Sequence, residues 1–356
     1  MQVFLLREDT ILFLFTYLYK AKTFTASTHM RIKIYTKGTD LPELINGPVL
    51  HSAMLFRSYE HGNSGKPYML VAYDDEGEEI GHLLMLKKHS IRIIPPVLSV
   101  WYSIQGEGAY RRNCNKEEIF GHFLERVFKM FDFRHTFIEV RNIEDSRFAY
   151  GILRRHNFIP VRDHRNYISL HSKDPKERLS RAYRAHIRKS EERGVSFRRA
   201  TERKEIQEAL NLMKGFYRSK TRKRLPQTEA LSNLLINSDG TLHEQAKMFL
   251  VMFKGKIIGA SICLYEETRA MLTYSFGLRK SFPLQFPGIM AIWAAITDAY
   301  RNGYEHFEFF EVRGLSRLRK SFLSTIDNFG GKDVGTLLWY HFKWNWVNKF
   351  LRWIYV

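Results

Sequence analysis

Two pairs of acidic and basic residues with the same spacing are the clearest candidates for chemistry in this sequence. Glu311 and Arg313 are separated by one residue, and Glu139 and Arg141 repeat that spacing earlier in the chain. Side chains two positions apart on a strand point to the same face of a sheet. A carboxylate there can take a proton from an amine, and a neighbouring guanidinium can stabilise negative charge or bind phosphate. Each pair could instead form ordinary ion pairs with its neighbours, and both interpretations stay open.

These pairs belong to a longer internal repeat. The run Phe137-Ile138-Glu139-Val140-Arg141 returns 172 positions later as Phe309-Phe310-Glu311-Val312-Arg313. Each copy is followed by a basic, helix-like segment that ends in Asn-Phe. A repeat that stays nearly in register with its surroundings indicates a duplicated unit. We therefore expect two units of one fold, each with its own sheet.

The elements that must position these residues follow the same order in both units. Each unit reads as a helix, a strand hairpin, a third strand, a helix, the repeated strand, a helix and a last strand. The predicted elements lie at residues 41–60, 68–86, 97–104, 116–131, 136–142, 146–156 and 167–170 in the first unit, and at 206–218, 248–262, 270–277, 289–301, 308–314, 318–326 and 336–340 in the second. An Ile-Gly pair follows each hairpin turn, which adds to the case for duplication.

We expect four segments along the chain. Residues 1–29 form a weakly ordered N-terminal extension, 30–172 the first domain, 173–194 a basic linker helix and 195–356 the second domain. The apolar run of nine residues near the N-terminus is too short for a bilayer that needs about 20 residues. Strand-like alternation begins at Met30, which we take as the working start, and we expect no transmembrane span.

The linker helix carries much of the positive charge. Residues 173–224 contain 18 Lys or Arg against seven Asp or Glu, while the whole chain has a formal net charge of +19. On a helix, Leu179 and Ile187 share an apolar face and four arginines share the other. Those arginines are Arg178, Arg181, Arg184 and Arg188. Such a surface favours a polyanionic partner, although it could also be only a solvated helix face.

Composition narrows the class of protein further. Apolar residues make up 44% and aromatic residues 14%, which is typical of folded domains and excludes a disordered chain. The two cysteines, Cys114 and Cys263, belong to no short metal or disulfide motif and fit a reducing cytoplasm. We expect a cytoplasmic protein without a metal site.

The order of elements resembles the GNAT acyltransferase fold, and two such units in tandem joined by an arginine-rich helix resemble the Fem-type aminoacyltransferases and related GNAT-like acetyltransferases. The matching segments are 181–189 with Gly194, 286–303 and 329–332. The resemblance implies an α/β fold of two tandem GNAT-like domains, each a mixed, mostly antiparallel sheet flanked by helices. It also implies acyl-CoA or aminoacyl-tRNA as the donor substrate.

The resemblance places the donor's phosphates at a turn and helix start in the second unit. GNAT enzymes use a pattern Arg/Gln-x-x-Gly-x-Gly/Ala, which this chain resembles at Gln285, Phe286, Gly288 and Ile289. Backbone N–H groups and the helix dipole favour phosphate there. Met290 stands where a small residue is usual, so we expect its bulk to hinder close approach. An ordinary Pro-Gly turn is the alternative. The corresponding loop of the first unit contains the acidic Glu107, which would repel pyrophosphate.

Direct attack of an amine on the donor carbonyl needs a base and a proton for the leaving group. We assign Glu311 as general base, Tyr274 as proton donor and Arg313 as the group that stabilises charge. No Ser-His-Asp or Cys-His arrangement is legible, so we expect no covalent enzyme intermediate.

The acceptor residues are predicted from charge. Arg184, Arg188 and Lys189 beside the domain junction, together with Arg57 of the first domain, could bind a phosphorylated acceptor or a cell-wall precursor. The basic run 220–224 reads as a loop.

The C-terminal segment suggests a second kind of partner. Residues 343–355 mix tryptophans with lysine and arginine, which suits a membrane interface and a lipid-linked acceptor. Packing of these rings onto the second domain is the alternative. For the whole chain, the rival to an acyl or aminoacyl transferase is a non-catalytic module that binds RNA, tRNA or an anionic membrane through its basic linker.

Overall fold

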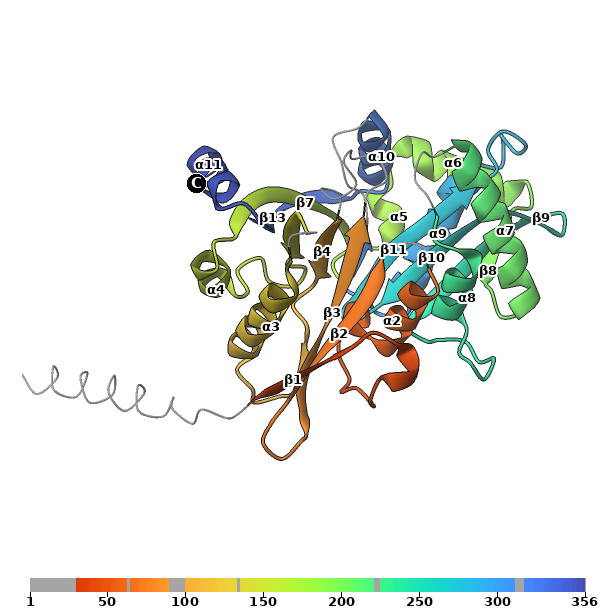
Figure 1. Ribbon diagram of the computed structural model, residues 1–356. Coiled ribbons are helices and arrows are strands. Elements are labelled where there is room, and N and C mark those ends of the chain that lie inside the picture. The colour runs from red at the N-terminus through yellow and green to blue at the C-terminus, as the bar shows by residue number, and fades with distance from the viewer. Residues whose placement is uncertain are drawn as a thin grey trace, which may run out of the picture.

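The structure is a computed structural model that describes residues 30–62, 65–89, 100–132, 135–220, 225–310 and 317–355. The N-terminal extension, most of the basic run 220–224 and both Glu311 and Arg313 lie outside the described residues. Figure 1 shows the chain as one twisted sheet with helices on both faces.

Within the described ranges, the first unit supplies seven strands and the second six. The first-unit strands are β1 (Arg31–Tyr35), β2 (Lys66–Tyr73), β3 (Glu79–His89), β4 (Val100–Gln105), β5 (Ala109–Tyr110), β6 (Phe137–Arg141) and β7 (Ile159–Ser169). The second-unit strands are β8 (Ser196–Arg199), β9 (Ala246–Phe253), β10 (Lys256–Tyr265), β11 (Arg269–Gly277), β12 (His306–Phe309) and β13 (Lys332–Phe342).

The helices follow the same two-fold division. The first unit contains α2 (Ala53–Glu60), α3 (Lys116–Met130) and α4 (Tyr150–Arg155), preceded by 3-10 turns at Gly38–Asp40 and Val49–His51. Between the units lie α5 (Pro175–Arg178) and α6 (Arg181–Glu192). The second unit contains α7 (Arg203–Lys220), α8 (Thr228–Leu235), α9 (Pro287–Arg301), α10 (Arg317–Asn328) and α11 (Asn345–Tyr355).

The strand order of the sheet is symmetric about its centre. Its order is β1-β2-β3-β4-β6-β13-β7-β12-β11-β10-β9-β8, with β5 paired to β3 at the side. The parallel pair β4–β6 in one half matches the parallel pair β11–β12 in the other, and the remaining neighbours are antiparallel. This symmetric order supports duplication, although the two half-sheets are joined rather than separate. The predicted fold of two mostly antiparallel GNAT-like units is confirmed.

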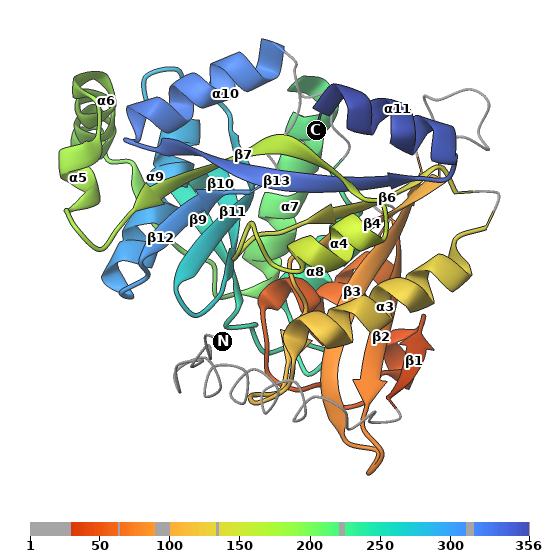
Figure 2. The same ribbon diagram turned by 90° about the vertical axis from the view of Figure 1, so that its left-hand side faces the viewer.

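The two halves are joined because each unit gives its last strand to the other. β7 of the first unit pairs with β12 of the second, and β13 of the second pairs with β6 of the first. The two exchanged strands also pair with each other from Ile159–Tyr340 to Tyr167–Lys332. Figure 2 shows them running side by side across the middle of the molecule.

Three apolar cores stabilise this arrangement. One belongs to the first unit, between α3, α4 and the sheet, and the exchanged strand β13 contributes the fully buried Trp339 to it. A second lies under α9 and receives Ile168 from the exchanged strand β7. The third is shared, because residues of α2 pack with residues of α7, α8, β9 and β10. The units are therefore tied both through the sheet and through a common core.

Several local predictions differ from the structure. The linker is two helices rather than one, because the chain is extended at Leu179 and the side chain of Ser180 caps the next helix by accepting from Tyr183 N at 3.2 Å. Arg178 does not share the open face of α6, since Gly330 packs against its Cβ. The first predicted helix begins only at Ala53, and β8 and α8 were not predicted.

Candidate functional site

The N-terminus of α9 lies tightly against the ends of two strands, and glycines make this possible. A Cβ on Gly277, the last residue of β11, would lie 2.2 Å from Gly288 N. A Cβ on Gly259 of β10 would lie 2.9 Å from Pro287 O. Pro287 is the first residue of the helix, and Phe286 before it has a positive φ of 43°. The first turn of α9 therefore presents backbone rather than side chain beside the sheet.

Beside this helix start lies β11, whose described pairs with β12 run from Arg269 to Leu272, followed by a bond from Phe310 N to Leu272 O at 3.0 Å. Residues 311–316, which follow β12, lie outside the described residues. On its other side, β11 pairs with β10 as far as Gly277. Tyr274 lies on this strand, half-buried, with its ring 6.3 Å from that of Tyr217.

Helix α6 holds the loop that leads into α9. Ser190 Oγ lies 2.9 Å from the carbonyl oxygen of Gln285, and Arg193 donates to the carbonyl of Leu284 at 2.6 Å. His186 stacks on Phe286 with ring centroids 4.0 Å apart and an interplanar angle of 16°. The linker helix α6 is therefore part of the candidate site at the start of α9.

The helix start also has a positive electrostatic environment. The pKa of His186 is lowered first by burial and then by the charges of Lys189 and Arg279, which places both cations near its ring. The first turn of α9 contains no acidic residue, and no side chain caps it. An uncapped helix N-terminus beside cations favours phosphate or another anion.

The corresponding helix of the first unit has the opposite character. The first turn of α3 carries Glu117 and Glu118, and Asn115 caps it by accepting from Glu118 N at 3.3 Å. The strands β4 and β6 also stay paired to their ends, with a further bond from Gly106 N to Arg141 O at 2.8 Å. The start of α3 is therefore capped and acidic, unlike the start of α9.

Glu107 fills the loop where the first unit would accept an anion. Its carboxylate accepts from the backbone N–H groups of Ile143, Glu144 and Asp145 at 2.7, 2.8 and 3.2 Å. Burial raises the pKa of Glu107, and these three hydrogen bonds oppose that rise. An internal carboxylate thus occupies the backbone donors that an external anion would need.

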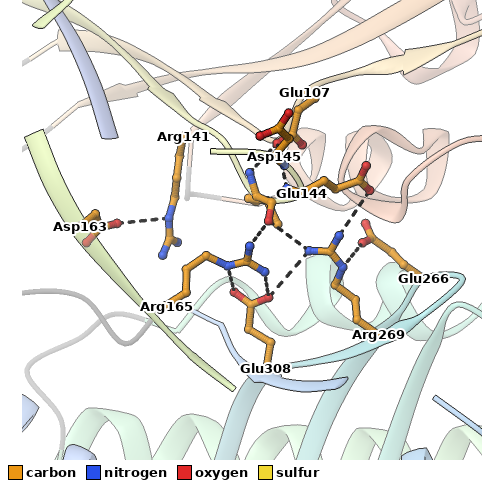
Figure 3. A network of polar contacts seen from close by, with 10 residues as sticks. Glu107, Arg141, Glu144, Asp145, Asp163, Arg165, Glu266, Arg269 and Glu308 are labelled. Atoms are coloured by element: carbon orange, nitrogen blue, oxygen red, sulfur yellow. Dashed lines mark hydrogen bonds and ion pairs between the residues drawn. The ribbon is translucent and has the colours of Figure 1, made fainter. Parts of the chain in front are cut away.

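A second cluster of charged residues lies where the two units meet. Arg165 of β7 donates through Nε to Glu308 of β12 at 2.9 Å and also pairs with its second carboxylate oxygen. Arg269 of β11 reaches Glu266 at 3.2 Å and Glu144 of the first unit at 3.4 Å. Figure 3 shows the two guanidinium groups converging between these carboxylates. We name these five residues the junction network; it borders a cavity of about 270 Å³.

The structure brings together only some of the predicted site residues. Gln285, Phe286, Gly288 and Ile289 all lie at the start of α9. Lys189 is near this site, and Arg184 and Arg188 are exposed on the same linker helix, with Arg188 paired to Glu192 at 3.4 Å.

Arg57 does not belong to this group. It lies on α2, which packs against α8 in the shared core, and α2 and α6 lie apart in both views (Figures 1 and 2). Sequence reasoning did not find the junction network or several residues beside α9, and four of the residues missed had a weak signal in the sequence. These are His186, Ser190, Arg279 and Glu308. In the sequence, only their positions pointed to them: His186 and Ser190 lie in the basic linker, Arg279 in the loop before α9 and Glu308 in the repeated strand.

Met290 does not hinder ligand approach. Its side chain is fully buried in the core under α9, together with Ala291 and Ala294. The prediction that its bulk would obstruct a phosphate is wrong, because the side chain points away from the open face of the first turn.

The described residues show neither a candidate metal site nor a candidate membrane-spanning helix. Among them, no group of three or more His, Cys, Asp or Glu side chains is placed to hold a metal ion. None of the helices in this part of the chain combines the length and apolar character that crossing a membrane requires.

Comparison with known proteins identifies the class. Residues 177–317 match the family model of the Acetyltransferase (GNAT) domain. This match spans α6, the loop before α9, α9 and β12, which are the elements of the candidate site. This segment of the chain accordingly carries a GNAT-type domain, which supports an acyltransferase activity. A search of curated proteins by sequence found no match.

Solved structures share the fold at low sequence identity. FemX aligns with a TM-score of 0.60 and 10% identity, covering 87% of this chain and 96% of FemX. L-PGS from Bacillus licheniformis aligns with a TM-score of 0.55 and 11% identity, covering 87% and 93%. The C-terminal domain of a putative lysylphosphatidylglycerol synthetase from Agrobacterium fabrum gives 0.52 and 11%, covering 76% and 82%. At these identities the likeness establishes the tandem fold and leaves donor and acceptor open.

Proposed function

We propose that this protein is an acyltransferase that binds the phosphates of an activated donor at the N-terminus of α9 and passes the donor's acyl or aminoacyl group to an amine of a phosphorylated or cell-wall-precursor acceptor. The observation that carries the proposal is the uncapped helix start that glycines allow to lie against the ends of β10 and β11. Lys189 and Arg279 supply the positive charge. The corresponding helix of the first unit is capped and begins with two acidic residues.

The proposed reaction is direct attack. The acceptor nitrogen forms a bond to the donor carbonyl carbon, and the bond from that carbon to the leaving sulfur or oxygen breaks. Glu311 takes the proton from the amine, Arg313 stabilises the negative charge that develops, and Tyr274 gives a proton to the leaving group. Tyr274 lies on β11, two residues beyond the last described pair with β12.

The donor is proposed as acyl-CoA or aminoacyl-tRNA, since both carry phosphates and an activated carbonyl on one molecule. The acceptor is proposed as an amine-bearing molecule with phosphate groups, held by the exposed face of α6 at Arg184 and Arg188. A lipid-linked form of that acceptor fits the same chemistry. FemX and the two synthetase structures share this fold, which is compatible with either donor.

Donor binding can be measured directly by thermal shift and calorimetric titration with CoA, acyl-CoA and aminoacyl-tRNA in parallel. A ligand that binds the native state raises its melting temperature. Arg279→Glu should lower the affinity for the donor that binds by about tenfold or more, because a charge-assisted bond to phosphate is replaced by repulsion.

The matched control is Lys116→Glu, which makes the same charge change at the start of α3 in the first unit. We expect it to leave donor affinity unchanged. Equal affinity for wild type and Arg279→Glu, or binding of none of the three donors, would reject α9 as the donor site. Salt-sensitive RNA binding without any donor would then favour the non-catalytic module.

Glu311→Gln tests the proposed base. The amide keeps the shape of the side chain and cannot accept the proton, so turnover should fall by about 10²- to 10⁴-fold with donor affinity and melting temperature nearly unchanged. The measurement is steady-state turnover alongside donor titration. Turnover equal to wild type would remove Glu311 as base and leave the donor site untouched.

A further inference from the structure

The C-terminal helix α11 turns its largest apolar side chains toward solvent. Trp353 is 82% exposed, Trp346 69%, Phe350 53% and Ile354 51%. Positions 346, 350, 353 and 354 fall on one face of a helix with 3.6 residues per turn. Three large rings and an isoleucine on one open helix face form an apolar patch of the kind that marks an interaction site.

The opposite side of α11 is fixed to the body of the protein. Asn348 is 3% exposed, and its side chain accepts from Phe342 N at 2.8 Å and donates to Phe342 O at 2.7 Å. Arg352 donates to the side chain of Asn157 in the first unit at 2.8 Å. The helix is thus held in a defined orientation with its aromatic face outward. Figures 1 and 2 place α11 at the outer edge of the molecule.

The expectation that these rings pack onto the second domain is not met by the structure. α11 contacts the exchanged strands β7 and β13, and its polar anchor reaches the first unit. Among the aromatic residues of α11, Trp346, Phe350 and Trp353 are all more than half exposed.

The charge next to this aromatic face is positive. Lys349 lies beside it on α11 and is exposed. Residues 341–356 contain two lysines, one arginine and no acidic residue. A partner that complements this face must therefore combine an apolar interior with a negatively charged surface.

We propose that α11 is a docking helix for an anionic phospholipid surface, into which Trp346, Phe350 and Trp353 insert at the level of the headgroups. Indole and phenyl rings are favoured at this depth, and basic side chains next to them bind lipid phosphates. A second copy of this chain is the poorer occupant, because pairing two α11 faces would bring like charges together. This inference is independent of the transfer reaction.

The test is sedimentation of the full chain with vesicles of phosphatidylcholine, with and without phosphatidylglycerol, at low and high salt. Wild type should bind the anionic vesicles and shift its tryptophan emission to shorter wavelength, with weaker binding at high salt. Trp346→Ala combined with Trp353→Ala should weaken binding at least tenfold, since most of the inserting apolar surface is removed.

Two controls make the result specific. Tyr300→Ala removes an exposed ring on α9 and should bind vesicles like wild type. The melting temperature of the double variant should match wild type, since both tryptophans face solvent. Lys349→Glu should reduce binding to the anionic vesicles.

Three outcomes would overturn the proposal. One is equal vesicle binding by wild type and the double variant, and another is wild-type binding to neither vesicle. The third is a dimer of the wild type in sedimentation equilibrium that the double variant abolishes, because this would assign the face to a second copy.

Discussion

At the scale of single residues, the junction network joins the two units through the buried carboxylate of Glu308 and two mostly buried guanidinium groups. Glu308 is 2% exposed and is paired on both carboxylate oxygens by Arg165. Ile143 of the first unit receives bonds from Arg165 and from Arg269, the latter at 3.4 Å. Breaking such a buried pair leaves an uncompensated charge, which costs about 3–5 kcal/mol. The loop after β6 is therefore held against strands of the second unit.

Glu266 gives this network a pH dependence. Its carboxylate lies 3.2 Å from Arg269 Nε, and burial raises its pKa from 4.5 to about 7. The folded state then binds a proton more tightly than the unfolded state, so the stability from this group is complete below about pH 4.5 and is lost as the pH rises through about 7.

We expect Glu266→Gln to remove this part of the pH dependence. As the pH rises between those two values, the unfolding free energy of the wild type should fall by at most about 3 kcal/mol relative to that of the variant. Urea unfolding at several pH values gives the difference directly. The exposed neighbour Glu267→Gln is the control and should follow wild type. A wild-type curve parallel to that of Glu266→Gln would contradict a raised pKa.

Within the described residues, the sheet gives the carboxylate of the repeated strand a counterpart that the sequence repeat does not. Glu139 pairs with Tyr340 of the exchanged strand β13, and Glu308 pairs with Tyr167 of the exchanged strand β7. The symmetric sheet thus matches Glu139 with Glu308, whereas the repeat matches Glu139 with Glu311, which lies outside the described residues. The pairing depends on strands that are far away in the chain, and the short motif does not encode them.

At the scale of elements, the first turn of α9 depends on backbone contact rather than on side chains. Gly277 and Gly259 allow the helix start to approach the sheet, while Met290, Ala291 and Ala294 of the helix fill the core beneath it. The positive end of the helix dipole is thereby held beside the end of β11. Its helical period was readable from the sequence, whereas the close approach required two strands and a loop to be placed first.

Gly277→Ala tests this contact. The added Cβ would lie 2.2 Å from Gly288 N and 2.6 Å from Gly288 Cα, so the helix start or the strand end must move. We expect destabilisation of about 1–3 kcal/mol or more, with donor affinity reduced because the first turn is displaced. Thermal unfolding and donor titration provide the two readouts.

The matched control is Gly215→Ala in α7, where a Cβ has nothing within 4 Å. Replacing glycine inside a helix should stabilise the protein by about 0.5–1 kcal/mol. If both alanine variants behaved alike, the close approach of α9 to β11 would not be the cause of the effect at Gly277.

Other elements show where local signals fail. The break between α5 and α6 follows Leu179, whose side chain is buried, so tertiary packing ends a helix that the charge pattern would continue. α3 was predicted to within one residue because its buried positions repeat at helical spacing and Asn115 caps it. Long periodic elements with caps were therefore predictable, and short elements that depend on partners were not.

At the scale of the whole molecule, exchange of the last strands makes each unit incomplete alone. Without β7, the edge of β12 facing the first unit loses its partner in the described residues. Without β13, β6 loses its partner and the first core loses Trp339. The shared core between α2 and α8 adds apolar area that would be exposed on separation. Duplication at the level of sequence has thus given one cooperative structure rather than two independent domains.

We therefore expect the full chain to unfold in a single calorimetric transition, with equal calorimetric and van't Hoff enthalpies. Phe120→Ala removes a fully buried ring from the core of the first unit and should cost about 3–5 kcal/mol, lowering that single transition as a whole. Segments 30–172 and 173–356 should fail to fold separately and should associate when produced together, because each carries the strand that completes the other. Two resolved transitions, of which Phe120→Ala moves only one, would show that the units fold independently despite their exchanged strands.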